Sequence, residues 1–257
     1  MKKLLGVAAI LGALAVTAAV RPALANPPCA PLDLCSGPCP ILIQFDANAF
    51  AHETSYSTTT FISTAGSQLD VVGLITQFGP ALPFLNPNDP NKEYTFHLTS
   101  LTSQGTTLSA NGPTTLYDCN YDSLTIGTFT IREGSPRNSP STAAQWAANP
   151  YGGVVVPATH DDGTIILSGV LCGFHTNIAK TGLTVSGSFR SNYHVTGGTL
   201  FPFIAGTEGL LGGNWCANLS GCHPANYSAH PNGKFDASNT VTPASRSTWG
   251  RIKVIYH

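Results

Sequence analysis

The stretch LTVSGSFRSNYHVTGG, residues 183–198, carries the clearest secondary-structure signal in the chain. Its apolar side chains stand at odd positions with polar residues between them, namely Leu183, Val185, Phe189, Tyr193 and Val195. Because side chains alternate between the two faces of a β-strand, this pattern predicts a long strand with one buried face. The pair Gly197-Gly198 then predicts a two-residue turn into a further strand over residues 199–205.

Strand patterns recur on both sides of this stretch. Residues 69–78 (LDVVGLITQF) are apolar on both faces, which is typical of a buried strand. Residues 94–98 (YTFHL) alternate, so that His97 is expected on the wetter face. An Asn-Gly pair at 232–233 predicts a hairpin turn, and the chain is expected to end in a strand over residues 249–256.

These elements together define the fold class. One short helix is predicted over residues 139–148, where a serine cap and a proline at the first helical position precede STAAQWAA. Many short strands joined by Gly, Pro and Asn turns indicate an all-β antiparallel fold, formed by a single domain over residues 41–257. We favour a β-sandwich and keep a barrel as the alternative, because closure of a sheet cannot be read from one sequence.

The first residues predict export. Two lysines precede an uncharged run rich in Ala, Leu and Val, and Ala23-Leu24-Ala25 matches the small-x-small site of signal peptidase. This order predicts a signal peptide over residues 1–25 and a mature chain that is secreted or held at the cell surface. The alternative is a membrane anchor, but the apolar run is shorter than the roughly 20 residues that cross a bilayer. No other segment of the sequence is expected to span a membrane as a helix.

Charge excludes one class of partner. The whole chain has 12 basic and 13 acidic residues, and three of the basic residues lie in the predicted signal peptide. The mature chain therefore has a formal charge of −4 and no basic stripe, so nucleic acid is not an expected partner.

All seven cysteines lie beyond the signal peptide, in a compartment where disulfides are the rule. Cys216 and Cys222 bracket a short loop and form the best single pair. Cys119 and Cys172, which belong to strand regions, are expected to cross-link neighbouring strands or sheets. The Pro- and Cys-rich coil predicted over residues 26–40 contains the other three, Cys29, Cys35 and Cys39. Two of these three are expected to pair, which leaves one over. The alternative is a thiolate metal site, but the spacing lacks a paired CxxC.

Two groups of residues are candidate binding sites. Six aromatic residues are candidates for a platform that stacks on a sugar ring, namely Trp146, Trp215, Trp249, Tyr151, Tyr193 and Tyr227. The alternative is that they belong to the core and to strand edges. His223, His230 and Asp236 form the only local cluster of possible metal ligands, in turn-like surroundings that also suit a solvent-facing loop.

No catalytic motif occurs. GxSxG, HExxH and SxxK are absent, and the run His160-Asp161-Asp162-Gly163 is interpreted as a turn before a strand. The sequence therefore favours a non-catalytic, cofactor-free protein for adhesion, envelope structure or partner binding, with a glycan or an envelope component as the partner. Two alternatives remain, a carbohydrate-binding module and a secreted hydrolase that uses a pair of carboxylates.

Overall fold

This computed structural model describes residues 40–121, 126–139, 158–204, 208–217, 222–223 and 227–237, with the side chains of residues 47, 48 and 158 excepted. Three predicted elements therefore lie outside the described residues: the signal peptide, the coil over 26–40 apart from Pro40, and the final strand over 249–256. The predicted helix over 139–148 also lies outside them apart from Ser139.

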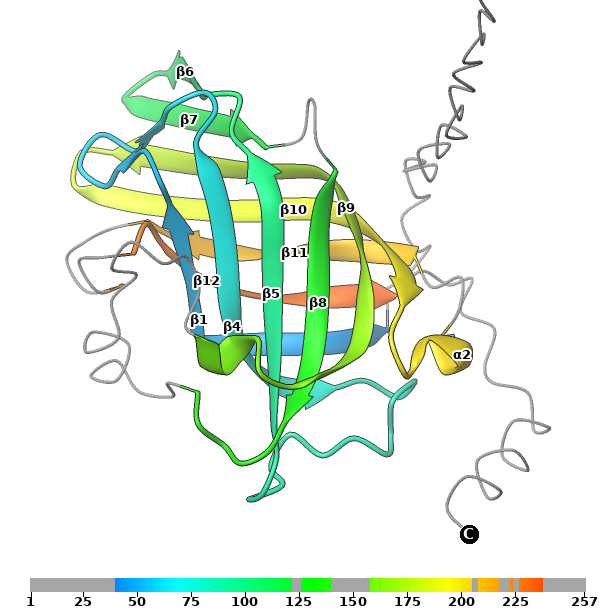
Figure 1. Cartoon of the computed structure of the whole chain (residues 1–257). Helices are drawn as coiled ribbons and strands as arrows, with labels where there is room; N and C mark the ends of the chain where they lie inside the picture. The colour runs from blue at the N-terminus through cyan, green and yellow to red at the C-terminus, as the bar shows by residue number, and fades with distance from the viewer. Residues whose placement is uncertain are drawn as a thin grey trace, which may run out of the picture.

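Eight antiparallel strands form a closed ring (Figure 1). In chain order these are β1 (Ile41–Glu53), β4 (Gln68–Phe78), β5 (Glu93–Thr102), β8 (Gly127–Gly134), β9 (Thr164–Thr181), β10 (Thr184–Gly197), β11 (Glu208–Cys216) and β12 (His230–Ala237). Their hydrogen-bonded order is β10-β11-β12-β1-β4-β5-β8-β9, and β9 pairs back onto β10. The all-β antiparallel fold class is confirmed, and the sheet closes into the barrel that the sequence left open as the alternative.

The barrel interior is a hydrophobic core in which many aromatic rings meet. The inward side chains come from every part of the ring and include Phe45, Phe96, Phe129, Phe174, Phe189, Tyr193, Trp215 and Phe235. Each of these is at most 4% exposed. The ring centroids of Phe45 and Phe96 are 4.4 Å apart, and those of Phe129 and Phe235 are 5.4 Å apart. Contacts at such distances bury large apolar areas, so the interior serves as the source of stability.

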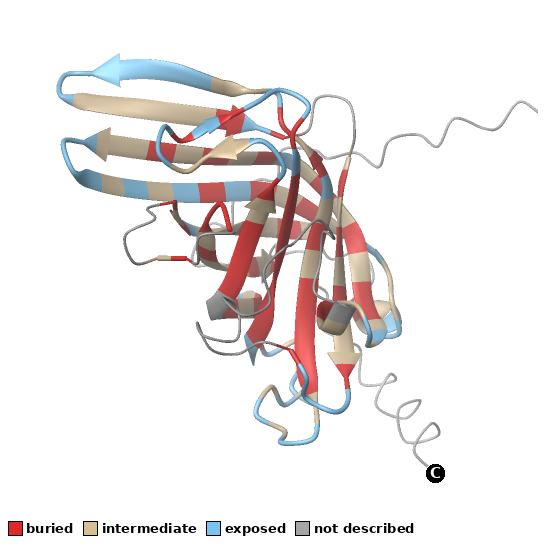
Figure 2. Cartoon of the chain, turned by 60° about the vertical axis from the view of Figure 1, so that its left-hand side comes forward, coloured by how far each residue is buried: buried red, intermediate tan, exposed pale blue. Residues whose placement is uncertain are grey.

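A second sheet region projects from the barrel. β6 (Thr106–Asn111) pairs with β7 (Thr114–Asn120), and β7 pairs with residues 175–181 of β9. We call the extension β6, β7, residues 175–181 and the part of β10 over residues 184–190. Figure 2 shows it leaving the barrel, with mostly exposed and half-buried residues in contrast to the buried strands below it. Phe189 and Ile178 pack into the core, and most other residues of the extension form a surface outside it.

Shorter elements complete the described chain. These are β2 (Tyr56–Ser57), β3 (Ile62–Ser63), the 3-10 helix η1 (Ala158–His160) and the helix α2 (Phe201–Ile204). The β2–β3 segment lies against the extension, where the rings of Phe61 and Tyr117 are 5.5 Å apart. None of the helices among the described residues is long and apolar enough to cross a membrane.

One strand prediction and one turn prediction are wrong. Residues 199–205 do not form a strand in their described part, which contains a turn and α2. Asn232 and Gly233 do not form a turn but lie inside β12, opposite Asn214 and Gly213 of β11. A Cβ atom at Gly233 would stand 2.5 Å from the backbone oxygen of Gly212 and 2.9 Å from Cζ of Phe189. The glycine is therefore needed for the close approach of the β11 backbone and of an inward ring, rather than to turn the chain.

Candidate functional site

An outward-facing hollow of about 380 Å³ lies over β1, β11 and β12. Its polar lining consists of Gln44, Asp46, Asn214, Asn232 and Lys234. Inward residues such as Phe235 alternate with Asn232 and Lys234 along β12, so the polar set stands on the outer face of the barrel. We call this feature the polar hollow.

Glycine creates the polar hollow. Gln44, Lys234, Gly212 and Arg190 lie opposite one another on the four neighbouring strands β1, β12, β11 and β10. Residues in such a row share one face of the sheet. Gly212 contributes no side chain, so a gap opens in the row between Lys234 and Arg190. The hollow is therefore a consequence of the local sequence.

The polar hollow offers several kinds of hydrogen-bonding group. Three residues have amide side chains, namely Gln44, Asn214 and Asn232. Each amide can both donate and accept hydrogen bonds. Asp46 adds an exposed carboxylate. The Nζ atom of Lys234 lies 3.0 Å from Oδ2 of Asp236 on the same strand, so its charge is balanced inside the protein. The lining therefore suits an uncharged ligand that is rich in hydroxyl groups.

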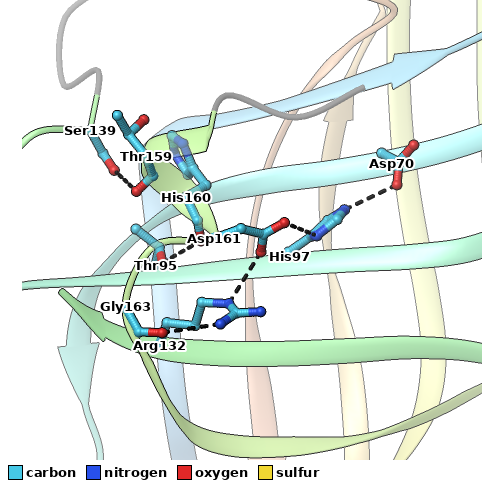
Figure 3. Close-up of polar contacts among 9 residues, drawn as sticks. All are labelled: Asp70, Thr95, His97, Arg132, Ser139, Thr159, His160, Asp161 and Gly163. Carbon is cyan, nitrogen blue, oxygen red and sulfur yellow. Dashed lines mark hydrogen bonds and ion pairs between the residues drawn. The ribbon is translucent and has the colours of Figure 1, made fainter. Parts of the chain in front are cut away.

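A second polar cluster lies on the outer face of β4, β5 and β8 (Figure 3). Nε2 of His97 is 3.0 Å from Oδ1 of Asp70, and Nδ1 of His97 is 3.3 Å from Oδ2 of Asp161. Arg132 donates from Nε to Asp161 over 3.2 Å and from a second nitrogen to the carbonyl of Gly163 over 3.0 Å. We call Asp70, His97, Arg132 and Asp161 the His97 cluster. It joins three strands to the segment that follows η1.

Electrostatics hold His97 in its charged form. Burial opposes the charge, but the hydrogen bonds with Asp161 and Asp70 outweigh it and raise the pKa of His97 to about 9. The hydrogen bond from His97 in turn lowers the pKa of Asp161. Because both ring nitrogens of His97 bond carboxylates, the ring has no free nitrogen with which to take a proton from a substrate. The cluster has the composition of a catalytic dyad, but its contacts hold the segment after η1 on the sheet. We call this role the clamp.

Neighbouring bonds strengthen this clamp. Thr95 donates to the carbonyl of His160 over 2.9 Å, and Ser139 donates to the carbonyl of Thr159 over 2.9 Å. The His160 side chain is fully buried, and burial lowers the pKa of His160 to about 4. Residues 158–163 are thus fixed on the sheet by the ion pair of charged His97 with Asp161 and by hydrogen bonds to the backbone carbonyls of Thr159 and His160.

A third polar cluster is enclosed where the β2–β3 segment meets the barrel. The carboxylate of Glu53 accepts hydrogen bonds from Ser63 and, over 3.0 Å, from Tyr121. Ser103 bonds Ser63 and lies 3.2 Å from Sγ of Cys119. Each of these five residues is at most 5% exposed, and burial raises the pKa of both Glu53 and Cys119. The cluster satisfies buried polar groups and leaves no surface for a substrate.

The six aromatic candidates are not gathered on one exposed surface in the described part of the chain. Tyr193 and Trp215 point into the barrel core. Tyr227 is buried on the other side of the sheet, with its ring 5.1 Å from that of Phe50. The other three, Trp146, Tyr151 and Trp249, lie outside the described residues.

The structure does not bring the predicted metal ligands together. Among the described residues, no three His, Cys, Asp or Glu side chains are placed to hold a metal ion. The ring of His230 stacks on Phe50 at 5.1 Å, Asp236 pairs with Lys234, and His223 is buried. These contacts tie the segment to the barrel.

The cysteine predictions have mixed outcomes. The Cys216–Cys222 disulfide is confirmed. The Cys119–Cys172 pair is wrong, because Cys119 is a free thiol. Cys119 lies opposite Thr176 of β9, which is four positions from Cys172. That is roughly 13 Å along a strand, well beyond the distance that a disulfide spans. Cys29, Cys35 and Cys39 lie outside the described residues.

Sequence reasoning missed the polar hollow entirely. Its residues come from strands separated by more than 150 positions, and their patterns mark only the outward face of each strand. The closest signal was the Gly212-Gly213 pair within a strand pattern, since glycine there suggests a close approach or a gap. Comparisons of the chain with protein-family models, with curated proteins and with solved structures each found no match.

Proposed function

We propose that the mature chain is a non-catalytic protein, secreted or held at the cell surface, that binds an uncharged glycan of the cell envelope or its surroundings. The polar hollow carries this proposal. It contains three amide side chains and one carboxylate, arranged around backbone that glycines leave uncovered, on the outer face of the barrel. An adhesion or envelope role follows from such binding, because the ligand would be part of a large structure.

The size and the chemistry of the polar hollow support the proposal. Small-molecule sites usually measure about 300–1,000 Å³, and the hollow has a volume of about 380 Å³. An amide can donate to one sugar hydroxyl and accept from its neighbour, which is the pattern that adjacent hydroxyls require. The core fills the barrel interior with aromatic rings, so recognition has to use the outer surface.

The hydrolase alternative has weaker support. Glu53 is enclosed, and its carboxylate accepts hydrogen bonds from side chains of the fold. Asp70 and Asp161 both bond His97. A glycosidase needs two carboxyl groups that face a bound sugar, one of them able to give up a proton. These three carboxyl groups are used to hold the chain together instead.

A binding assay with matched variants tests the proposal. The purified mature protein would be mixed with insoluble polysaccharides and with cell envelopes, and the retained fraction would be measured. We expect retention that Asn232→Ala and Asn214→Ala each weaken several-fold, because each removes an amide from the lining. Asn192→Ala is the control, since this residue lies on β10 outside the polar hollow. Equal retention of all variants, or no retention on any polysaccharide or envelope, would refute glycan binding at this site.

A further inference from the structure

The extension ends in a strand that has one neighbour among the described strands. β6 is the last strand in the sheet order, next to β7. Its residues from Thr107 to Asn111 are exposed, and the side chain of Leu108 is 53% exposed. Such an edge presents backbone N–H and C=O groups that can pair with another strand.

The hydrogen bonds of β7 identify which backbone groups point outward. Tyr121 N donates to Phe174 O over 3.0 Å, and Gln104 N donates to Asn120 O over 2.9 Å. Thus the N–H of Tyr121, just after β7, points toward β9, and the C=O of Asn120 points toward the β6 side. Backbone groups alternate in direction along an antiparallel strand. Even-numbered residues of β7 therefore bond β6.

The register of the hairpin carries this alternation to β6. Thr107 lies opposite Asp118, and Leu108 lies opposite Tyr117. Since Asp118 bonds toward β6, Thr107 is engaged with β7, whereas the N–H and C=O of Leu108 point to the open side. The same holds for its even-numbered neighbours Thr106 and Ala110. None of the described strands pairs with this side of β6, so these three residues form its open edge, and Oγ1 of Thr106 accepts a hydrogen bond from Ser63 N over 2.7 Å.

Natural edge strands are usually protected against pairing, but this one is not. Lysine, proline and inward charges are the common devices, and the strand Thr106–Asn111 (TTLSAN) contains none of them. It has no charge that would repel an identical strand. Leu108 is the central residue whose backbone points to the open side, and contact with another apolar side chain would bury its exposed side chain favourably.

We propose that the β6 edge pairs with the β6 edge of a second copy of this chain, forming an antiparallel two-fold dimer. In the register that keeps like faces together, Leu108 lies opposite Leu108 of the second copy, and Thr106 lies opposite Ala110. The backbone groups of Thr106, Leu108 and Ala110 in each copy then exchange hydrogen bonds with the other copy, about six in total. A symmetric contact of this kind closes on itself and does not grow into a fibre. The dimer does not depend on the proposed glycan binding, and it would present two polar hollows.

Cysteine cross-linking tests the register. In the proposed dimer the two Leu108 Cα atoms are about 5.5 Å apart, a distance that a disulfide can span. Leu108→Cys should therefore form a covalent dimer on mild oxidation. Thr107→Cys is the matched control, because Thr107 lies opposite Ser109 of the second copy and not opposite itself. Absence of the Leu108→Cys cross-link, or equal cross-linking of the control, would overturn the proposal.

Light scattering coupled to gel filtration provides the second measurement. The wild-type chain should have the mass of two copies, and Ala110→Pro the mass of one. Proline removes an N–H that points to the open side, so the pairing with β7 and the circular dichroism spectrum should be retained. A monomeric wild-type chain, or a folded Ala110→Pro variant that is still a dimer, would show that the β6 edge does not join two copies.

Discussion

The His97 cluster makes the stability of the chain depend on pH in the alkaline range. The informative perturbation is His97→Gln, which removes the titrating group and keeps a side chain that can donate a hydrogen bond. The pKa of His97 is about 9 in the folded chain, against 6.5 for an ordinary histidine. The unfolded chain thus loses the proton first as pH rises. The stabilisation from charged His97 is complete below about pH 6.5 and is lost as pH rises through about 9.

The size of the effect follows from the pKa difference. A shift of one pKa unit corresponds to about 1.4 kcal/mol, so the rise from 6.5 to about 9 corresponds to about 3 kcal/mol. The side chain of His97 is only 11% exposed, so solvent screening takes away little of this value. The lowered pKa of Asp161 comes from the same contact with His97, so no separate free energy is added for it. This amount is a large share of the stability of an ordinary domain.

Urea unfolding at a series of pH values measures the effect. We expect the free energy of unfolding of the wild-type chain to fall by up to about 3 kcal/mol between pH 6.5 and 9, and that of His97→Gln to stay nearly level. Asp161→Asn should give an intermediate slope, because one of the two carboxylates is retained. If wild type and His97→Gln have the same slope over this range, His97 is not held in its charged form and the clamp assignment is incorrect.

Three further outcomes follow from buried groups. Burial lowers the pKa of His160 to about 4, so the stability that comes from its neutral form is present above pH 6.5 and lost as pH falls through 4. In the same urea series, His160→Gln should reduce this loss of stability at acid pH. Gly233→Ala should lower stability by about 1–3 kcal/mol, since the new Cβ would press on the backbone oxygen of Gly212 and on the Phe189 ring. Gly212→Ala, whose Cβ would be 3.3 Å or more from other atoms, should cost less, and thermal melts compare the two. Cys119, buried and with a raised pKa, should resist iodoacetamide until the chain unfolds, and mass spectrometry detecting rapid labelling of the native chain would contradict this.

Strand patterns were sufficient for the fold class, because each strand packs one face on the core. The alternation around Phe96 placed His97 correctly on the wetter side of β5. The Asn232-Gly233 pair failed for a physical reason. Asn-Gly is a good turn former, but the same glycine also admits a neighbouring ring inside a strand. Local preference could not separate these two uses, and the packing around Phe189 decided between them.

The sites were harder to predict, since their residues meet only after the sheet has closed. Asp70 lies 27 positions from His97 along the chain, and Asp161 lies 64 positions from it, so no spacing motif marks the cluster. Asp161 was interpreted as part of a turn. Its position directly after η1 agrees with that interpretation, which gives no sign of its partner. The choice between sandwich and barrel had the same origin, because the ring of strands depends on pairings between distant segments, such as β1 with β12.

The pairing of β9 with β10 also has a mechanical consequence. The two strands run side by side from Thr181 opposite Thr184, at the tip of the extension, to Ser168 opposite Gly197 in the barrel wall. A pull on the tip would act along both strands, at right angles to the hydrogen bonds that join β9 to β8 and β10 to β11, so many bonds would share the load at once. Pulling β6 sideways would instead break its bonds one after another. If the chain works under tension, β6 should therefore detach from the extension at a lower force than the force that separates β9 and β10 from the barrel wall.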